Sequence, residues 1–438
     1  MAKAVDVMDM LHARDRRAAR QQALLAQYGA PLISFTMNIA GPVKRTALID
    51  RGFDLALQRL EQQLRACRAA VLHRELVRED TGCQALYAVD LSARQLKAMC
   101  VALEEADELG RLLDLDVLDR DGGKLEREQE RRCLICGSVG KGCARSRAHS
   151  VEELQQRTEE ILRCTLDREE HTRIGELACR ALLYEACTAP KPGLVDRLGS
   201  GSHTDMDLFT FMSGAAALQP YFTRCAAIGQ ETAQQSPRET FAALRSVGRL
   251  AEGNMLRATG GVNTHKGAVF LMGLACAALG RLGREGSSAA VLKECAAMAS
   301  GVTAELGTAD QTAGERFYRD HGLRGIRGEA EDGFPSAWQT GLPALEQALA
   351  AGKTPEQAGC EALLALMSVC EDTALVHRVG YGGWQKVKLQ AARLLQEGVT
   401  QQALEQLDRD MIAHNASPGG SADLLALCWL LHFWENEK

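Results

Sequence analysis

The sequence predicts two domains, an α+β domain over residues 1–165 and an all-α domain over residues 166–438. Its 438 residues are long for one hydrophobic core and sufficient for two. Short strand-like runs alternate with helical runs in the first part, whereas strand signals nearly vanish after residue 172. Residues 151–170 are charged and helical in pattern, so no flexible Gly/Ser/Pro linker divides the two parts.

The N-terminal part begins with a predicted amphipathic helix over residues 5–27. Apolar residues recur there at helical spacing, and Arg14, Arg16, Arg17 and Arg20 occupy the remaining faces. Further helices are predicted near residues 53–72 and 93–106, and strands over residues 32–39, 84–89 and 112–118. The Asp-Arg-Asp-Gly-Gly sequence at residues 119–123 predicts a hairpin-type turn after the last strand.

The C-terminal part is rich in Ala, Leu, Gln and Glu, in windows of a dozen or more residues separated by glycine. This pattern predicts an all-helical domain. We predict helices over residues 177–186, 208–218, 241–252, 268–279, 289–305, 342–349, 358–369, 384–396 and 422–433.

Charge and apolar patterning exclude several classes of protein. The net charge of −6 gives no global field that would recruit nucleic acid or a membrane. The longest apolar runs, such as residues 268–279, are too short to span a bilayer, and residues 1–11 lack the apolar centre of a secretory signal. We therefore expect a cytoplasmic protein that binds neither nucleic acid nor membrane.

Most of the fifteen cysteines are scattered singly through helical patterns and are expected to be reduced, buried side chains. One cluster differs, because Cys133, Cys136, Cys143 and His149 offer four metal ligands at close spacing. Zinc would explain the cluster, although only the first cysteine pair has the usual spacing of a structural site. The alternative is a reduced loop whose arginines matter more than its thiols.

An irregular block interrupts the helical pattern at residues 185–196 and 201–207. Two prolines and a glycine break the helix there, and the block carries Lys191, Asp196, His203, Asp205 and Asp207. Such a segment can direct these side chains to one place. The alternative is a surface turn with solvated charges.

This block resembles the signature of triphosphoribosyl-dephospho-CoA synthases. Further similar blocks follow in the same order at residues 255–267, 314–318, 325–335, 371–378 and 415–423. The resemblance implies a magnesium-dependent enzyme that joins the ribose of ATP to the 2'-hydroxyl of 3'-dephospho-CoA and releases adenine. The product would be the precursor of the citrate lyase prosthetic group.

The first 165 residues resemble a different enzyme, the apo-citrate lyase phosphoribosyl-dephospho-CoA transferase. The similar pieces lie at residues 34–44, 110–117, 132–137 and 143–149. The chain is thus expected to be a fusion that performs two consecutive steps. The second step would attach the group to a serine of the citrate lyase acyl carrier protein, with loss of pyrophosphate.

The transferase site is expected around an acidic pair on the strand over residues 112–118. Alternation places Asp114 and Asp116 on one face of that strand, where two carboxylates can hold Mg²⁺ and the triphosphate being displaced. A glycine followed by Asp-x-Asp on a strand also resembles the nucleotidyltransferase pattern. The alternative is a solvated acidic face. The cations expected to neutralise the departing pyrophosphate are Lys44, Arg111, Arg145 and Arg147.

The synthase chemistry resembles glycoside cleavage, which relies on carboxylates as acid, base and electrostatic groups. The expected catalytic carboxylates are Glu185, Asp205, Glu329, Asp332 and Asp372, and the expected Mg²⁺ ligands are Asp205 and Asp207. Which of these residues is acid, base or metal ligand stays open at this point.

The sequence contains no Walker loop, so the triphosphate must be held at helix N-termini and by side-chain cations. The expected phosphate-binding residues are Gly260, Gly261, Lys191, Lys266, Arg378, Ser417, Gly419 and Gly420. For Ser417, Gly419 and Gly420, the alternative is an ordinary capped helix start.

Asp205 and Asp207 cannot both face the nucleotide if they fall at a helix start, because i and i+2 diverge by about 200° at 3.6 residues per turn. We expect Asp205 to face it and Asp207 to cap the helix. Two other functions stay open: a synthase for the related malonate decarboxylase group, and a nucleotide-binding protein without catalysis. The N-terminal resemblance argues against the first, and the intact acidic pairs argue against the second.

Overall fold

The computed structural model of the chain describes residues 3–307 and 313–437. The chain divides into two compact units, which we call unit 1 (Met1–Glu169) and unit 2 (Glu170–Lys438) and describe separately. No helix within the described residues is long and apolar enough to cross a membrane.

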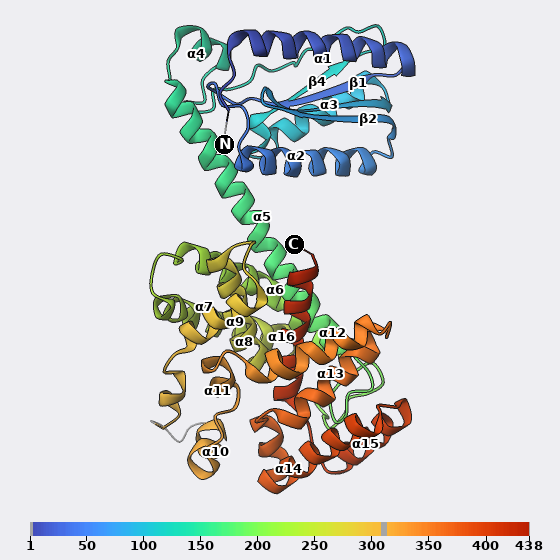
Figure 1. Ribbon diagram of the computed structural model, residues 1–438, viewed down its shortest axis with the longest axis vertical. Helices are drawn as coiled ribbons and strands as arrows, with labels where there is room; N and C mark the ends of the chain where they lie inside the picture. Colours follow the sequence, from blue (N-terminus) through green and yellow to red (C-terminus); the bar gives the residue numbers. More distant parts are fainter. Residues whose placement is uncertain (1–2, 308–312, 438) are drawn as a thin grey trace. The chain divides into compact units, whose positions relative to one another are not determined.

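Unit 1 is built on a small antiparallel sheet with strand order β2-β3-β1-β4 (Figure 1). This agrees with the predicted α+β class. Its elements are α1 (Val7–Tyr28), β1 (Leu32–Met37), α2 (Ala47–Ala66), β2 (Ala70–Glu79), β3 (Gly82–Asp90), α3 (Ala93–Glu105), the 3₁₀ turn η1 (Gly110–Leu112), β4 (Leu113–Leu118), α4 (Gly140–Ser146) and the first part of α5 (Val151–Cys187).

Helices cover both faces of the sheet, α1 on one and α2 with α3 on the other (Figure 1). On the α2 side, Phe53 stacks on Phe35 of β1 with ring centroids 4.6 Å apart. Leu113, Leu115 and Val117 of β4 are buried in this same core. The alternate residues of β4 therefore face the α1 side of the sheet.

The edge strand β2 was not predicted, and the predicted helix over residues 53–72 is wrong at its C-terminal end. Helix α2 stops at Ala66, and residues 70–72 already belong to β2. Four of its ten residues are charged and none is buried, so the strand lacks the apolar alternation that identifies a strand. Its ladder with β3 and ion pairs such as Arg20–Glu75 (2.6 Å) hold it in place.

All the regular elements described in unit 2 are helices, as predicted. After the remainder of α5 come α6 (Leu208–Glu231), α7 (Pro237–Ala258), α8 (Lys266–Leu282), α9 (Ser288–Ala299), η2 (Val302–Gly307), α10 (Ala313–His321), α11 (Gly325–Glu331), η3 (Ala337–Gly341), α12 (Leu342–Ala350), α13 (Pro355–Val369), α14 (Thr373–Glu397), α15 (Gln401–Ala413) and α16 (Gly419–Asn436). Helices α10, α11 and α15 were not predicted, and the helix predicted over residues 289–305 ends at Ala299.

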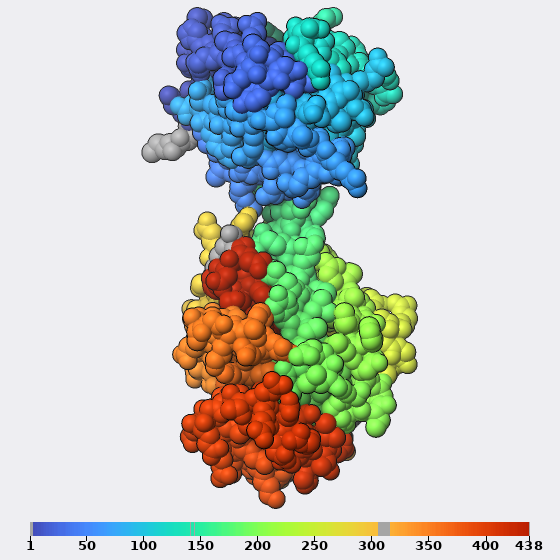
Figure 2. Space-filling model, turned by 90° about the vertical axis from the view of Figure 1, so that its right-hand side faces the viewer, coloured from blue at the N-terminus to red at the C-terminus, as the bar shows by residue number. Residues whose placement is uncertain are grey.

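Helices α8 and α16 form the centre of unit 2, because both are apolar on all sides and most of their residues are buried. In Figure 2, the end of α16 (dark red) lies beside the green helix α5. The guanidinium of Arg180 on α5 lies 3.9 Å from the ring centroid of Phe433 on α16, and that of Arg173 lies 4.6 Å from the ring of Trp434. These cation–π contacts anchor α16 to α5.

Candidate active sites

Unit 2 encloses a cavity of about 360 Å³ to which widely separated segments contribute. Helices α5, α6, α8, α11, α14 and α16 supply part of its wall, and the loops before α6, α8, α14 and α16 supply the rest. Its charged and imidazole side chains are Glu185, Glu329, Glu371, Asp423, Lys191, Lys266, Arg378, His203 and His265.

The irregular block that follows α5 lies inside unit 2 and is not a surface turn, because every residue from 188 to 196 is buried. The carboxylate of Asp196 accepts hydrogen bonds from the backbone N–H groups of Lys191 (2.9 Å) and Leu198 (2.7 Å) and closes the loop on itself. Gly193 has φ = 72° and lies against the Ala416 carbonyl, so a side chain at this position would clash. The loop consequently directs Lys191 into the cavity.

Lys191 and Glu185 form a buried ion pair, with Nζ and Oε1 2.5 Å apart and both side chains at most 5% exposed. Burial raises the pKa of the Glu185 carboxyl, and the charge of Lys191 opposes that rise. Each charge of such a pair needs the other, since an unpaired ion in this environment is strongly destabilising.

Asp423 of α16 was missed as a separate site residue, although it ends one of the resembling sequence blocks. It lines the cavity and accepts a hydrogen bond from the backbone N–H of Ala268, near the N-terminus of α8. A β-carbon on Gly267 would lie only 1.9 Å from its Oδ2, so a glycine is needed there. Burial, reinforced by the charges of Glu185 and Asp372, raises the pKa of Asp423 well above its ordinary value.

Two more carboxylates line the cavity. Glu329 of α11 accepts hydrogen bonds from the hydroxyl (2.5 Å) and backbone N–H (3.2 Å) of Ser336, and burial raises its pKa. Glu371 was not predicted, and its Oε2 accepts a hydrogen bond from the backbone N–H of Arg324 at 2.9 Å. Glu329 and Glu371 raise the density of negative charge in the cavity.

Arg378 and two histidines provide the polar side of the cavity. Arg378 lies 3.1 Å from His203 Nδ1, and His203 Nε2 lies 2.9 Å from the Ser417 hydroxyl. Burial and then the charge of Arg378 lower the pKa of His203. Burial lowers the pKa of His265 to about 3, and its Nε2 is buried without a hydrogen-bond partner among the described residues. The sequence analysis included His203 in the irregular block that directs side chains to one place, but it missed His265 as a site residue.

Several predicted residues lie outside this cavity. Asp205 is 62% exposed and 4.0 Å from His203 Nδ1, whereas Asp207 is the N-cap of α6 and accepts a hydrogen bond from Thr210 N at 2.9 Å. Asp332 pairs with Arg324 at the surface. Gly260 and Gly261, both with positive φ, form the turn after α7.

Asp372 is buried behind the cavity wall and connects two helices. It caps α14 through Leu375 N (3.0 Å) and accepts hydrogen bonds from the N–H (2.9 Å) and hydroxyl (3.1 Å) of Ser421 at the start of α16. The N-terminus of α16, where Gly419 and Gly420 line the cavity, is thus already occupied by a protein carboxylate.

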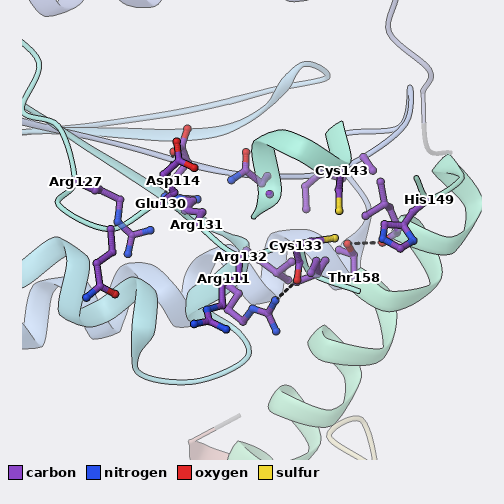
Figure 3. A pocket seen from close by; sticks show the side chains of 18 of the residues that line it. Arg111, Asp114, Arg127, Glu130, Arg131, Arg132, Cys133, Cys143, His149 and Thr158 are labelled. Carbon is purple, nitrogen blue, oxygen red and sulfur yellow. Dashed lines mark hydrogen bonds and ion pairs between the residues drawn. The ribbon is translucent and has the colours of Figure 1, made fainter. Parts of the chain in front are cut away.

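Unit 1 contains a larger cavity of about 1140 Å³, lined by β4, residues 124–134, α4 and α5 (Figure 3). Asp114 and Asp116 both line it, on the face of β4 opposite the buried leucines, as the alternation predicted. Each carboxylate lies beside a cation: Asp116 is 2.7 Å from Lys124 Nζ, and Asp114 is 3.3 Å from Arg131 NH2.

The four predicted cations of unit 1 are distributed differently. Arg111 and Arg147 line the large cavity, and Arg145 is exposed and lies outside it. Lys44 lies in a smaller adjoining cavity of about 210 Å³, which also includes Asp114. Its Nζ donates to the Ile39 carbonyl at 2.6 Å, and burial lowers its pKa.

The smaller cavity adds Arg14 and Arg17 of α1, which were not predicted as site residues. Burial lowers the pKa of Arg17, and the charges of Asp114 and Asp116 oppose that effect. Their i, i+3 spacing places both arginines on one face of α1. The sequence shows this spacing, but the same spacing occurs on helix faces that only contact solvent.

The cysteine cluster also gathers in unit 1. The ligand atoms of Cys133, Cys136, Cys143 and His149 all lie within 4.8 Å of one another. Figure 3 shows Cys133, Cys143 and His149 together on one side of the large cavity.

Comparisons with known proteins divide the chain between residues 165 and 171, where the two compact units also meet. Residues 171–438 match the family described as ATP:dephospho-CoA triphosphoribosyl transferase, and residues 5–165 match apo-citrate lyase phosphoribosyl-dephospho-CoA transferase. Protein CitXG of Haemophilus influenzae is 39% identical over 448 aligned positions, which cover 95% of this chain and 94% of that protein. The 2-(5''-triphosphoribosyl)-3'-dephosphocoenzyme-A synthase of Pectobacterium atrosepticum is 43% identical over 270 positions, covering 60% of this chain and 90% of that enzyme.

Proposed function

The chain belongs to the ATP:dephospho-CoA triphosphoribosyl transferase family, joined to an apo-citrate lyase phosphoribosyl-dephospho-CoA transferase part, and we propose that this transferase makes and attaches the citrate lyase prosthetic group. The observation that carries the proposal is the similarity to Protein CitXG along 95% of the chain. It is supported by a separate charged cavity in each unit.

In the first proposed step, unit 2 takes ATP and 3'-dephospho-CoA. The bond between C1' of the ATP ribose and adenine breaks, and a new bond forms from C1' to the 2'-oxygen of dephospho-CoA. Adenine must gain a proton and the 2'-hydroxyl must lose one. The products are 2'-(5''-triphosphoribosyl)-3'-dephospho-CoA and adenine.

The cavity carboxylates suit these two proton transfers. Burial raises the pKa of Asp423 well above its ordinary value and so favours its protonated form, and we assign it as the acid that protonates adenine. Glu329 has a raised pKa and is correspondingly more basic than an exposed carboxylate, so we assign it as the base.

Charged groups around the same cavity suit the triphosphate. Lys266 and Arg378 supply positive charge, and the unpartnered Nε2 of His265 offers one more polar contact. The carboxylate of Glu371, which lines the same cavity, has the hard oxygen donors that Mg²⁺ prefers. The ion, when bound with ATP, would neutralise the triphosphate.

In the second proposed step, unit 1 transfers the phosphoribosyl-dephospho-CoA group to a serine hydroxyl of the citrate lyase acyl carrier protein. The serine oxygen bonds to the α-phosphorus, and the bond from the α-phosphorus to the oxygen that bridges to the β-phosphate breaks. Pyrophosphate leaves with that oxygen, and the hydroxyl proton passes to solvent. The strand carrying Asp114 and Asp116 supports a nucleotidyltransferase-like arrangement in which both hold Mg²⁺. Arg111 and Arg147 would receive the departing pyrophosphate, with Arg14 and Arg17 as further cations.

The test incubates the full chain with ATP, dephospho-CoA, Mg²⁺ and apo acyl carrier protein. Adenine is measured by chromatography, and the carrier protein by mass spectrometry. We expect adenine release without the carrier and a carrier heavier by one prosthetic group when all components are present. Adenine release without loading of the citrate lyase carrier, but with formation of a malonate decarboxylase precursor, would favour the alternative pathway. The absence of both signals would refute catalysis.

A further inference from the structure

We propose that Cys133, Cys136, Cys143 and His149 bind one zinc ion, as a closed structural site that holds one wall of the unit 1 cavity. The four ligand atoms lie within 4.8 Å of one another, and the sulfurs of Cys136 and Cys143 are 3.4 Å apart. A tetrahedral zinc with bonds of about 2.0–2.3 Å separates its ligands by about 3.5–3.8 Å. The ligands therefore reach zinc geometry by shifts of side-chain size.

The backbone brings the four ligands together from two short pieces. Arg132 and Val139 form an antiparallel bridge, and Cys133 N donates to the Ser138 carbonyl at 2.6 Å. The turn between them holds Gly137 at φ = 71°, which points the thiols of Cys133 and Cys136 to the same side.

Helix α4 and the turn after it supply the remaining two ligands. Cys143 lies within this helix, and Arg147 ends it in the left-handed conformation at φ = 51°. The chain changes direction at Arg147, which brings the His149 imidazole next to the three thiols. The histidine Nε2 is buried and has no hydrogen-bond partner among the described residues, as expected of an atom whose partner is a metal.

Apolar burial cannot explain the fold of this segment. Among the described side chains of residues 121–150, Cys133 alone is buried, and apolar residues such as Ile135 and Val139 are exposed. A segment of this length without a core of its own is ordinarily held by a metal or by disulfides. Three thiols and an imidazole are the ligands that zinc selects.

The site connects to the cavity wall through its neighbours in the chain. The guanidinium of Arg111 donates to the Cys133 carbonyl at 2.5 Å, and Arg131 donates to the Leu113 carbonyl at 2.7 Å while lying 3.3 Å from Asp114. With four protein ligands, the ion has no open position and does no chemistry itself. Its proposed role is to position Arg111 and Arg131 beside the acidic strand.

The test measures metal in the full chain, purified without chelators and without a metal-affinity column. Inductively coupled plasma mass spectrometry should find about one zinc ion per chain. Replacement by Co²⁺ should give the intense visible bands of a tetrahedral thiolate site. Cys136→Ser should lose at least about tenfold in zinc affinity, whereas the matched variant Cys164→Ser, an exposed thiol of α5 in the same unit, should keep its zinc.

Three results would overturn the proposal. The first is less than about 0.1 zinc per chain together with no cobalt spectrum. The second is an equal zinc affinity and zinc content in the Cys136→Ser variant and the unmodified chain. The third is a disulfide between Cys136 and Cys143 in place of metal, found by peptide mapping. These readouts do not depend on either enzymatic step, so they can fail while the proposed function stands.

Discussion

Replacing Lys191 by methionine removes the cation from a buried ion pair, and we expect the loss in stability to grow with pH. In the variant, Glu185 has no counter-charge and is held in its neutral form. In the unfolded chain it ionises with a pKa of about 4.3, so keeping it protonated at pH 7 costs about 3.7 kcal/mol. This cost agrees with the loss of about 3–5 kcal/mol in stability that is typical when one partner of a buried ion pair is removed.

The sign of the pH effect follows from proton counting. The folded variant binds one proton more than the unfolded chain, so its free energy of unfolding falls by about 1.4 kcal/mol per pH unit. The free-energy cost of keeping Glu185 protonated in the folded variant is about 2.3 kcal/mol at pH 6 and about 5 kcal/mol at pH 8. A second change, Glu185→Gln, removes the titrating group and should abolish this slope.

Urea unfolding followed by tryptophan fluorescence measures this effect in the intact chain. All four tryptophans, at positions 338, 384, 429 and 434, lie in unit 2, so the signal reports that unit. Lys266→Met is the matched control, because this lysine lines the same cavity but is 65% exposed. A Lys191→Met variant as stable as the control, or one whose stability does not change from pH 6 to pH 8, would refute the reasoning.

Four further predictions separate the two units and their residues. Asp114→Asn should lower carrier loading by about a hundredfold without changing adenine release; loss of both would disprove separate sites. Asp207→Ala should lower the free energy of unfolding in urea by about 1 kcal/mol, since Asp207 caps α6, whereas Asp205→Ala, at a 62% exposed position that caps no helix, should leave it unchanged. Gly267→Ala should displace Asp423 and reduce adenine release, and the helical control Gly253→Ala, which has open space around it, should not. Removal of Mg²⁺ by a chelator should stop both reactions and its return should restore them; activity that persists would exclude the metal assignments.

The fold was largely predictable where apolar periodicity is strong. Strand β4 was predicted because its apolar residues repeat at strand spacing, and the buried α8 because it is a long Ala- and Leu-rich window bounded by glycine. The edge strand β2 and helix α15 were missed because charged and polar residues interrupt the apolar pattern of each. Local pattern does not distinguish a solvated face from one that packs on a sheet edge or beside a loop.

The site was predictable only in part, because it depends on contacts between distant segments. Sequence blocks identified Glu185, Lys191 and Glu329, which the fold does bring to one cavity. Asp423 and His265 lie beside them only because α8 and α16 pack together, which no local spacing reveals. In contrast, the placement of Asp207 at the start of α6 followed from helix geometry alone.

The pairing of the acidic strand with its own cations affects the order in which ligands arrive in unit 1. Asp116 pairs with Lys124, and Asp114 lies 3.3 Å from Arg131, which also pairs with the buried Glu104. A free Mg²⁺ would therefore have to displace Lys124 from its carboxylate and bind against the charge of Arg131. A triphosphate that carries its Mg²⁺ gives the carboxylates an ion and the two cations phosphate oxygens in the same event. Ion and nucleotide then strengthen each other's binding by the same factor. We therefore expect Mg²⁺ to enter unit 1 bound to the triphosphate, and the carboxylates and cations of the strand to change partners in that single binding event.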